Sequence, residues 1–372
     1  MSDRFRDLLR QVGSGTHTSE ALTRSQAAEA MRLMLLEEAT PAQIGAFLIA
    51  HRIRRPTGEE LAGMLDAYEE IGPQLQSVTS APFVLGCPYD GRSRTAPMAP
   101  LTALILVTAG VRVILHGGQR MPTKEGIPLI EVWQGLGLDW SKLSLAQVQK
   151  VFAELGLGFV YLPQHFLAAE KLVTYRREIG KRPPLATMEL IWKPYLGQAT
   201  VVCGYVHPPT ETMFREAFHW RGVTDFITVK GLEGSCDLPR DRTCIIGLHQ
   251  PGQQTQIVKD PTKILTKNPI LDDVFFERLL LHPRDYGFDG REVTLSSTPI
   301  LIEQIQTVLK GQSSEFMKAT LWNGGFYLWR SGVGVCQDLE SGLSSVESLI
   351  TEGKVQAKLQ EIQNYFFNGD LK

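Results

Sequence analysis

The 372-residue chain lacks several features that would assign it to a specialised class of protein. Its five cysteines, at positions 87, 203, 236, 244 and 336, form no CxxC pair. An odd count without a framework argues against disulfides and a zinc knuckle, and favours reduced thiols in a cytoplasmic protein. No apolar run reaches membrane-span length, because Arg112 interrupts the nearest candidate, "LTALILVTAGVRVIL". The N-terminus has no apolar signal core, so we expect no membrane partner.

An excess of charge of one sign is also missing. The sequence has 38 Lys and Arg against 40 Asp and Glu, which gives a net charge of −2. No global basic field therefore points to nucleic acid, and any anion site must be a local cluster. With 43% apolar and 21% charged residues, the composition is that of a soluble globular protein with two domains or one large one.

The first part of the chain, residues 1–76, is predicted to form helices only. A capping signal precedes each of three apolar-periodic segments: Thr23 with Gln26 before 25–39, Thr40-Pro41 before 41–54, and Thr57 with Glu60 before 58–71. Apolar residues between Met31 and Leu36 exceed what one helical face needs. We therefore expect some of them to pack against a second domain or subunit.

From residue 82 onward, strands alternate with helices. Strands are expected at 82–87, 112–118, 159–163, 199–206 and 225–231, and helices at 100–111, 144–158, 209–223, 314–332 and 338–366. The predicted fold class is α/β: an all-α N-terminal helical domain (1–76, joined in space by about 163–190) and an α/β domain (77–372) with a largely parallel sheet flanked by helices. Ligands bind such sheets at the carboxyl ends of strands, here the loops 86–95, 116–126 and 230–237.

Three segments carry a resemblance that covers nearly the whole chain in order. They are "EEATPAQIGAFLIAHRIRRPTGEELAGMLDA", "AGVRVILHGGQRMPTKEG" and "NGGFYLWRSGVGVCQDLESGLSSVESLITEGKVQAKLQEI". They resemble the anthranilate phosphoribosyltransferases of glycosyltransferase family 3 and the related pyrimidine nucleoside phosphorylases. The resemblance implies a ligand cleft between the two domains and a homodimer formed through the N-terminal helices.

The catalytic motifs of this chain depart from that family. The family's diphosphate loop, Gly-Thr-Gly-Gly-Asp-Gly, reads Gly86-Cys87-Pro88-Tyr89-Asp90-Gly91 here. Pro88 removes an amide donor, and Tyr89 adds bulk where backbone should approach a phosphate. The family's Asn-x-Ser-Thr motif reads Pro97-Met98-Ala99-Pro100 and has lost its polar side chains.

The family's metal-binding Asp-Glu pair is also missing, which leaves Glu233 and Asp237 separated in "VKGLEGSCDLP". Magnesium held by substrate phosphates needs one or two carboxylates in fixed positions. Glu233 alone is a weak metal ligand, so no cofactor is firmly expected. Mg²⁺ is implied only if the chain is catalytic.

Other positions keep the family's residues. His116-Gly117 and Lys124 match its second ligand loop, and Arg176 falls where the family places the arginine that meets the anthranilate carboxylate. "PYDGRSRTAP" and "KGLEG" resemble a divergent branch of the family that is associated with nucleic-acid binding. Arg92 and Arg94 are therefore interpreted as additions to a rebuilt loop.

The candidate anion-binding residues are Gly86, Asp90, Gly91, Arg92, Arg94, His116, Gly117, Lys124 and Arg176. Each also has a plainer interpretation: solvated surface charge for the arginines, an exposed turn for Lys124, and a hydrogen-bonded strand terminus for His116. Trp192 is interpreted as a core or interface residue.

Three functions are compatible with these residues. One is a polyanion-binding or nucleic-acid-binding protein that uses a basic interdomain cleft. The second is a pentosyltransferase that acts on phosphoribosyl diphosphate with anthranilate or another small acceptor. The third is an enzyme for a different phosphorylated or carboxylated small molecule. Because three motifs are damaged together, we expect no genuine anthranilate activity.

Overall fold

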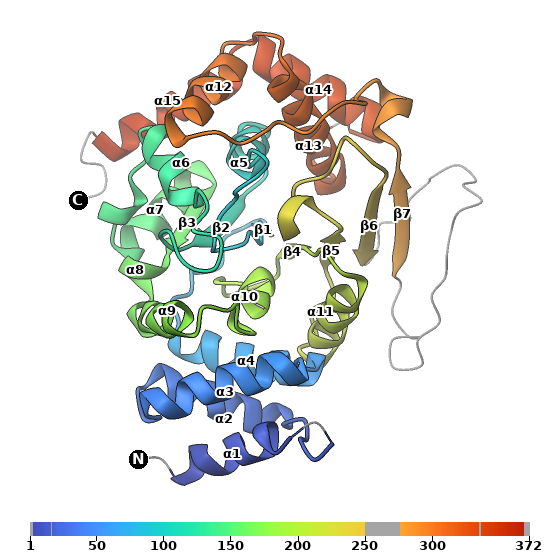
Figure 1. Cartoon of the computed structure of the whole chain (residues 1–372). Coiled ribbons are helices and arrows are strands. Elements are labelled where there is room, and N and C mark those ends of the chain that lie inside the picture. The colour runs from blue at the N-terminus through green and yellow to red at the C-terminus, as the bar shows by residue number, and fades with distance from the viewer. Residues whose placement is uncertain (1–2, 16, 250–275, 335, 368–372) are drawn as a thin grey trace.

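The computed structural model of the chain describes residues 3–15, 17–249, 276–334 and 336–367. Figure 1 shows the N-terminal helices at the bottom, a sheet with its flanking helices in the middle, and the C-terminal helices at the top. This arrangement confirms the predicted fold class, a helical N-terminal domain followed by a mostly parallel sheet flanked by helices. Among the described residues, no helix is both long and apolar enough to cross a membrane.

The bottom layer consists of α1 (Asp3–Gly13), α2 (Arg24–Leu35), α3 (Pro41–Arg54) and α4 (Gly58–Ile71). The predicted starts of three of them are confirmed, because Thr23, Thr40 and Thr57 each cap a helix and form a capping box. Met31 and Met34 are fully buried inside their own chain. The expected dimer therefore cannot rest on these two residues, and it stays a prediction.

Within the described residues, the sheet has seven strands in the order β3-β2-β1-β4-β5-β6-β7. The strands are β1 (Phe83–Leu85), β2 (Val113–Gly117), β3 (Leu157–Tyr161), β4 (Thr200–Gly204), β5 (Phe226–Val229), β6 (Cys244–His249) and β7 (Glu277–Leu281). Neighbours from β3 to β5 pair in parallel, whereas β6 and β7 are antiparallel. Sequence reasoning missed β6 and β7, which extend the sheet at one edge.

Several boundaries differ from the expectation by a few residues, and one of them has a clear cause. The helix expected at 144–158 is α7 (Leu145–Leu155) and ends earlier, and β3 begins at Leu157. Gly156 is the reason, because it adopts a left-handed φ of 82° that terminates the helix.

Helices cover both the sheet and its ends. They are α5 (Ala99–Thr108), α6 (Leu129–Gly135), α8 (Leu162–His165), α9 (Leu167–Ile179), α10 (Leu185–Met188), α11 (Pro208–Trp220), α12 (Thr298–Leu309), α13 (Glu315–Ser331), α14 (Leu339–Thr351) and α15 (Lys354–Phe367). Short 3₁₀ turns are η1 (Trp140–Lys142), η2 (Glu189–Ile191), η3 (Leu232–Gly234) and η4 (Pro283–Tyr286). The buried helix α5 packs on β2 and β3 and against α13 and α15.

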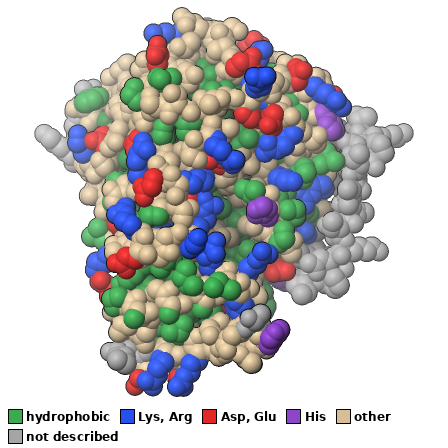
Figure 2. All heavy atoms as spheres, viewed as in Figure 1, with side chains coloured by type: hydrophobic (Ala, Val, Ile, Leu, Met, Phe, Trp, Pro, Cys, Tyr) green, Lys and Arg blue, Asp and Glu red, His purple; other side chains and the backbone are tan. Residues whose placement is uncertain are grey.

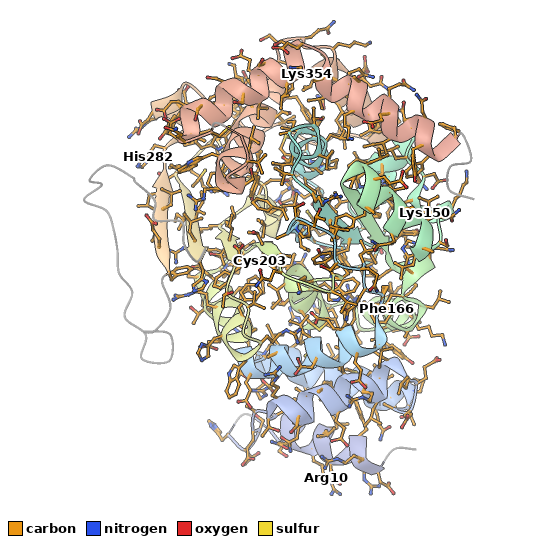
Figure 3. The ribbon with its side chains drawn as sticks, turned by 180° about the vertical axis from the view of Figure 1, so that it is seen from behind. Arg10, Lys150, Phe166, Cys203, His282 and Lys354 are labelled. Carbon is orange, nitrogen blue, oxygen red and sulfur yellow. The ribbon has the colours of Figure 1, made fainter. Side chains whose placement is uncertain are left out.

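The helical layer joins the α/β part through an aromatic cluster. Tyr68 of α4 contacts Phe166 with ring centroids 4.6 Å apart, and Trp192 at 5.1 Å. Phe166, labelled in Figure 3, lies just above the helical layer. On the same side, α9 packs against α2 and α3, and α11 packs against α4. These contacts place the carboxyl-end loops of the sheet close to the helical layer.

Candidate functional site

Two of the three predicted ligand loops are joined directly through their backbones. Because β1 and β2 are parallel neighbours, they end at one edge of the sheet. The backbones of Arg92 and Ile127 exchange two hydrogen bonds, and Gly126 N–H donates to the Asp90 carbonyl at 2.9 Å. Gly91 has a left-handed φ of 76°, and a Cβ there would lie 2.6 Å from the Gly126 backbone. The close approach of these two loops therefore requires glycine at position 91.

The third loop inserts the carboxylate of Glu233 into the first. Backbone N–H groups of Ser93, Arg94 and Thr95 donate to it at 3.2, 3.0 and 3.0 Å, and the Ser93 and Thr95 hydroxyls both donate at 3.1 Å. Burial alone would raise the pKa of Glu233, but the Arg92 guanidinium and the backbone N–H groups hold that pKa well below its usual range. Glu233 itself has a left-handed φ of 53°, a conformation that a non-glycine residue keeps only where its surroundings fix it.

Arg92 is buried and pairs with carboxylates of its own chain. Its Nη1 donates to Ser235 Oγ at 2.7 Å and also to Asp237, and its Nε lies 3.4 Å from Glu233 Oε1. Its other terminal nitrogen donates to the Thr95 hydroxyl. The prediction that Arg92 lines an open anion cleft is therefore corrected, because its donors are directed to groups inside the protein. The separated acids Glu233 and Asp237 do meet, with this guanidinium between them.

Lys124 and the remaining arginines lie over this buried core. Lys124 Nζ donates to the Gly91 carbonyl at 3.0 Å and is 3.5 Å from Glu233 Oε2 and 3.6 Å from Asp90 Oδ1. Arg182 forms an ion pair with Asp90. The side chain of Arg94 is 79% exposed, and Asp90 and Glu233 are only 3% exposed. The acidic groups thus lie inside the site with Arg92, whereas Arg94 and Arg182 are more exposed and Lys124 is 19% exposed.

These outer cations continue toward the helical layer. Arg52, near the end of α3, donates its Nε to the Arg182 carbonyl at 2.9 Å. We call Arg52, Arg94, Lys124 and Arg182 the cationic strip. Figure 2 shows Lys and Arg side chains gathered along the middle of this face, above the helical layer.

Arg176 and His116 are also buried. Arg176 forms an ion pair with Glu189, and burial raises the pKa of this glutamate to about 7. His116 Nδ1 is 2.6 Å from the Tyr89 hydroxyl, and its ring centroid is 5.1 Å from that of Trp192. Burial lowers the pKa of His116 to about 3, so the ring is neutral at pH 7. The position of His116 near the end of β2 matches its plainer interpretation, a hydrogen-bonded histidine at a strand terminus, and Arg176 is buried beside Glu189.

The remaining glycines of the predicted site are covered by protein. A Cβ on Gly86 would lie 2.0 Å from the Leu190 carbonyl oxygen, and Gly117 is buried as the last residue of β2. Cys87 and Cys236 bring the first and third loops into contact, with their sulfurs 3.8 Å apart. The cavity left between these loops measures about 10 Å³ and is lined by residues that include Gly91, Arg92 and Asp237. A space of that size holds at most about one water molecule.

The acids in this site do not fit a divalent cation. Both oxygens of Glu233 accept hydrogen bonds from the loop, and Asp237 pairs with Arg92 and accepts from the Met98 N–H at 3.1 Å. Among the residues that the structure describes, no group of three or more His, Cys, Asp and Glu side chains could hold a metal ion. The Glu233 oxygens, which the sequence suggested as weak Mg²⁺ ligands, thus already accept hydrogen bonds from Arg92 and from backbone N–H groups.

Sequence reasoning missed several residues that complete this site. They are Ser93, Thr95, Arg182, Glu189 and Ser235, all of which bond to the predicted residues. Glu189 could have been found from the sequence. It is the only acid in the apolar run "LATMELIW", and a buried charge requires a partner.

Comparison with known proteins identifies relatives along the whole chain. Residues 6–72 match the helical bundle domain of a glycosyl transferase family. An anthranilate phosphoribosyltransferase of Symbiobacterium thermophilum is 33% identical over 230 residues, which are 61% of this chain and 64% of the relative. Another, of Xanthobacter autotrophicus, is 26% identical over 358 residues, or 96% and 95% of the two chains. The solved structure of anthranilate phosphoribosyltransferase from Saccharomyces cerevisiae in complex with PRPP and Mg has the same fold, with a TM-score of 0.77 and 14% identity over 98% of each chain.

Proposed function

Given that this chain belongs to the anthranilate phosphoribosyltransferase-like family of glycosyl transferases, we propose that it binds nucleic-acid phosphates and does not transfer phosphoribosyl groups. The observation that carries the proposal is how the charged side chains of the site are arranged from the interior to the surface. Carboxylates are buried and paired within the protein, and the more exposed cations Arg94 and Arg182 lie above them, with the largely buried Lys124 beside Asp90 and Glu233. This outer layer presents positive charge to a ligand that stays at the surface.

Two features speak against phosphoribosyl transfer. That reaction depends on amides, cations and a metal ion placed around a diphosphate leaving group. Here Glu233 accepts the amides of residues 93–95, directly after the segment that matches the family's diphosphate loop, and Glu189 pairs with the arginine that resembles the acceptor-binding one. Two internal carboxylates therefore already occupy donors that an anionic substrate would need.

The cationic strip supports binding to a long polyanion. Its residues come from the helical layer, from the segment after α9 and from two loops of the α/β part, and contacts link Arg52 to Arg182 and Lys124 to the Arg94 loop. A small phosphorylated ligand needs an enclosed site, whereas a nucleic-acid backbone needs only spaced surface cations. Phosphate contacts of this kind carry no base information, so we expect weak sequence preference.

The test is fluorescence anisotropy with a labelled oligo-dT, repeated with an oligonucleotide of mixed sequence. The variant Arg52→Ala with Arg94→Ala removes two exposed cations of the strip. If both contact phosphate, affinity falls for every sequence and the salt dependence becomes shallower by about 1.4 in log–log slope, at ~0.7 for each contact with a single strand.

The matched control is Lys142→Ala with Arg284→Ala, which removes two exposed cations outside the strip. It should keep the parent's affinity and slope. The proposal is contradicted if the two double variants weaken binding equally, or if the parent binds neither oligonucleotide at low salt. In the second case an enzyme that acts on a small phosphorylated ligand becomes the better account.

A further inference from the structure

The loop of residues 92–95 has the construction of an anion-binding site. Three consecutive residues, Ser93, Arg94 and Thr95, turn their backbone N–H groups to one point. Successive N–H groups that converge in this way form a nest, a concavity that binds anions in many phosphate sites. In this chain the point of convergence is occupied by the carboxylate of Glu233.

The nest offers more donors than a carboxylate can use. Glu233 Oε1 accepts from Arg94 N–H, Thr95 N–H, the Thr95 hydroxyl and Arg92 Nε, and Oε2 accepts from Ser93 N–H and the Ser93 hydroxyl. A carboxylate has about four lone-pair sites, and six donors lie around it here. A phosphate group, with three or more oxygens that can accept strong hydrogen bonds, matches this set better.

Charge around the nest also fits a phosphate. Lys124 Nζ is 3.5 Å and Arg94 Nε is 4.0 Å from Glu233 Oε2. Asp237 pairs with Arg92, and Asp90 pairs with Arg182. Removal of the Glu233 charge would therefore leave the nest with surplus positive charge. Because Ser93 and Arg94 are exposed, an ion can approach from solvent.

We infer that residues 92–95 form a phosphate-binding nest and that Glu233 is its internal occupant, which keeps the nest closed to phosphate in the native chain. The ligand class is inorganic phosphate or a phosphate monoester. This inference does not depend on the proposed nucleic-acid binding, because it concerns a buried donor set and is tested with inorganic phosphate alone.

The test is titration calorimetry of the full chain with inorganic phosphate at low ionic strength. Glu233→Ala vacates the nest, and Glu303→Ala is the matched control, since it removes one exposed acid from α12. Glu233→Ala should bind phosphate at a single site at least about tenfold more tightly than the parent, a difference of ~1.4 kcal/mol. Glu303→Ala should behave like the parent.

Two further variants keep the test decisive. Glu233→Gln retains the length of the side chain without its charge, and it should fold even if the alanine variant does not. It should bind phosphate more tightly than the parent. Adding Thr95→Val to Glu233→Ala removes one hydroxyl donor and should weaken the new site. The inference is overturned if neither Glu233 variant exceeds the parent, if the parent already binds as tightly, or if Glu303→Ala gains the same affinity.

Discussion

At the scale of single residues, the site is organised by carboxylates that the chain supplies to its own cations and amides. Glu233 is held by the 92–95 loop, and Glu189 is held by Arg176. Both acids are buried, and such pairs persist because an uncompensated buried charge is expensive. Removing one partner of such a pair should therefore lower the free energy of unfolding.

The Arg176–Glu189 pair gives a sharp prediction. Glu189→Leu alone should lower the free energy of unfolding by about 3–5 kcal/mol, because it leaves Arg176 charged and buried. Arg176→Met should cost less, because Glu189, whose pKa is about 7 beside the arginine, takes up a proton once that cation is removed. The double variant should be much closer to the parent, since apolar side chains of similar volume replace the pair. Chemical denaturation of the four proteins provides the double-mutant cycle. A Glu189→Leu variant within ~1 kcal/mol of the parent would contradict the structural role given to this pair.

At the scale of elements, α3 presents an apolar face that its own chain leaves open. Ala42, Ala46, Ile49 and Ile53 follow helical spacing, and Ile53 is 73% exposed. A Cβ on Gly45 would meet nothing within 4 Å. In Figure 2, apolar side chains gather in the lower part of the molecule, over the helical layer. A second copy of the chain is a suitable cover for this face.

We therefore predict a homodimer that packs through α3. Ile53→Asp would place an unpaired charge in that interface, at a cost of several kcal/mol, and should give a monomer near 41.4 kDa by light scattering. The control Ile300→Asp changes an exposed apolar residue on α12 and should stay dimeric. A monomeric parent at micromolar concentration, or an Ile53→Asp dimer, would refute the prediction.

The helices and loops also show what the sequence could and could not predict. Caps such as Thr23 and Thr57 are local signals, so the starts of α2 and α4 were predicted correctly. Parallel pairing brings strand ends together, so the ligand loops were predicted as neighbours. The burial and ion pairing of Arg92 could not be predicted, because its partner Glu233 is 141 residues away and reaches it only through tertiary packing.

At the scale of the whole molecule, the protein has the fold of a phosphoribosyltransferase, and the buried cations Arg92 and Arg176 are paired with carboxylates of the same chain. The first and third loops are in contact through Cys87 and Cys236, and the cavity between them is about 10 Å³. Arg94 and Arg182 of the cationic strip are 79% and 40% exposed to solvent. The central claim is that this arrangement excludes the family's substrate.

The most direct test is a calorimetric titration of the parent chain with phosphoribosyl diphosphate in the presence of Mg²⁺. We predict no saturable binding up to millimolar concentration, because the amides of Arg94 and Thr95 and the buried cations Arg92 and Arg176 already have partners within the chain. Saturable 1:1 binding at micromolar concentration, particularly if anthranilate is then consumed, would contradict the account.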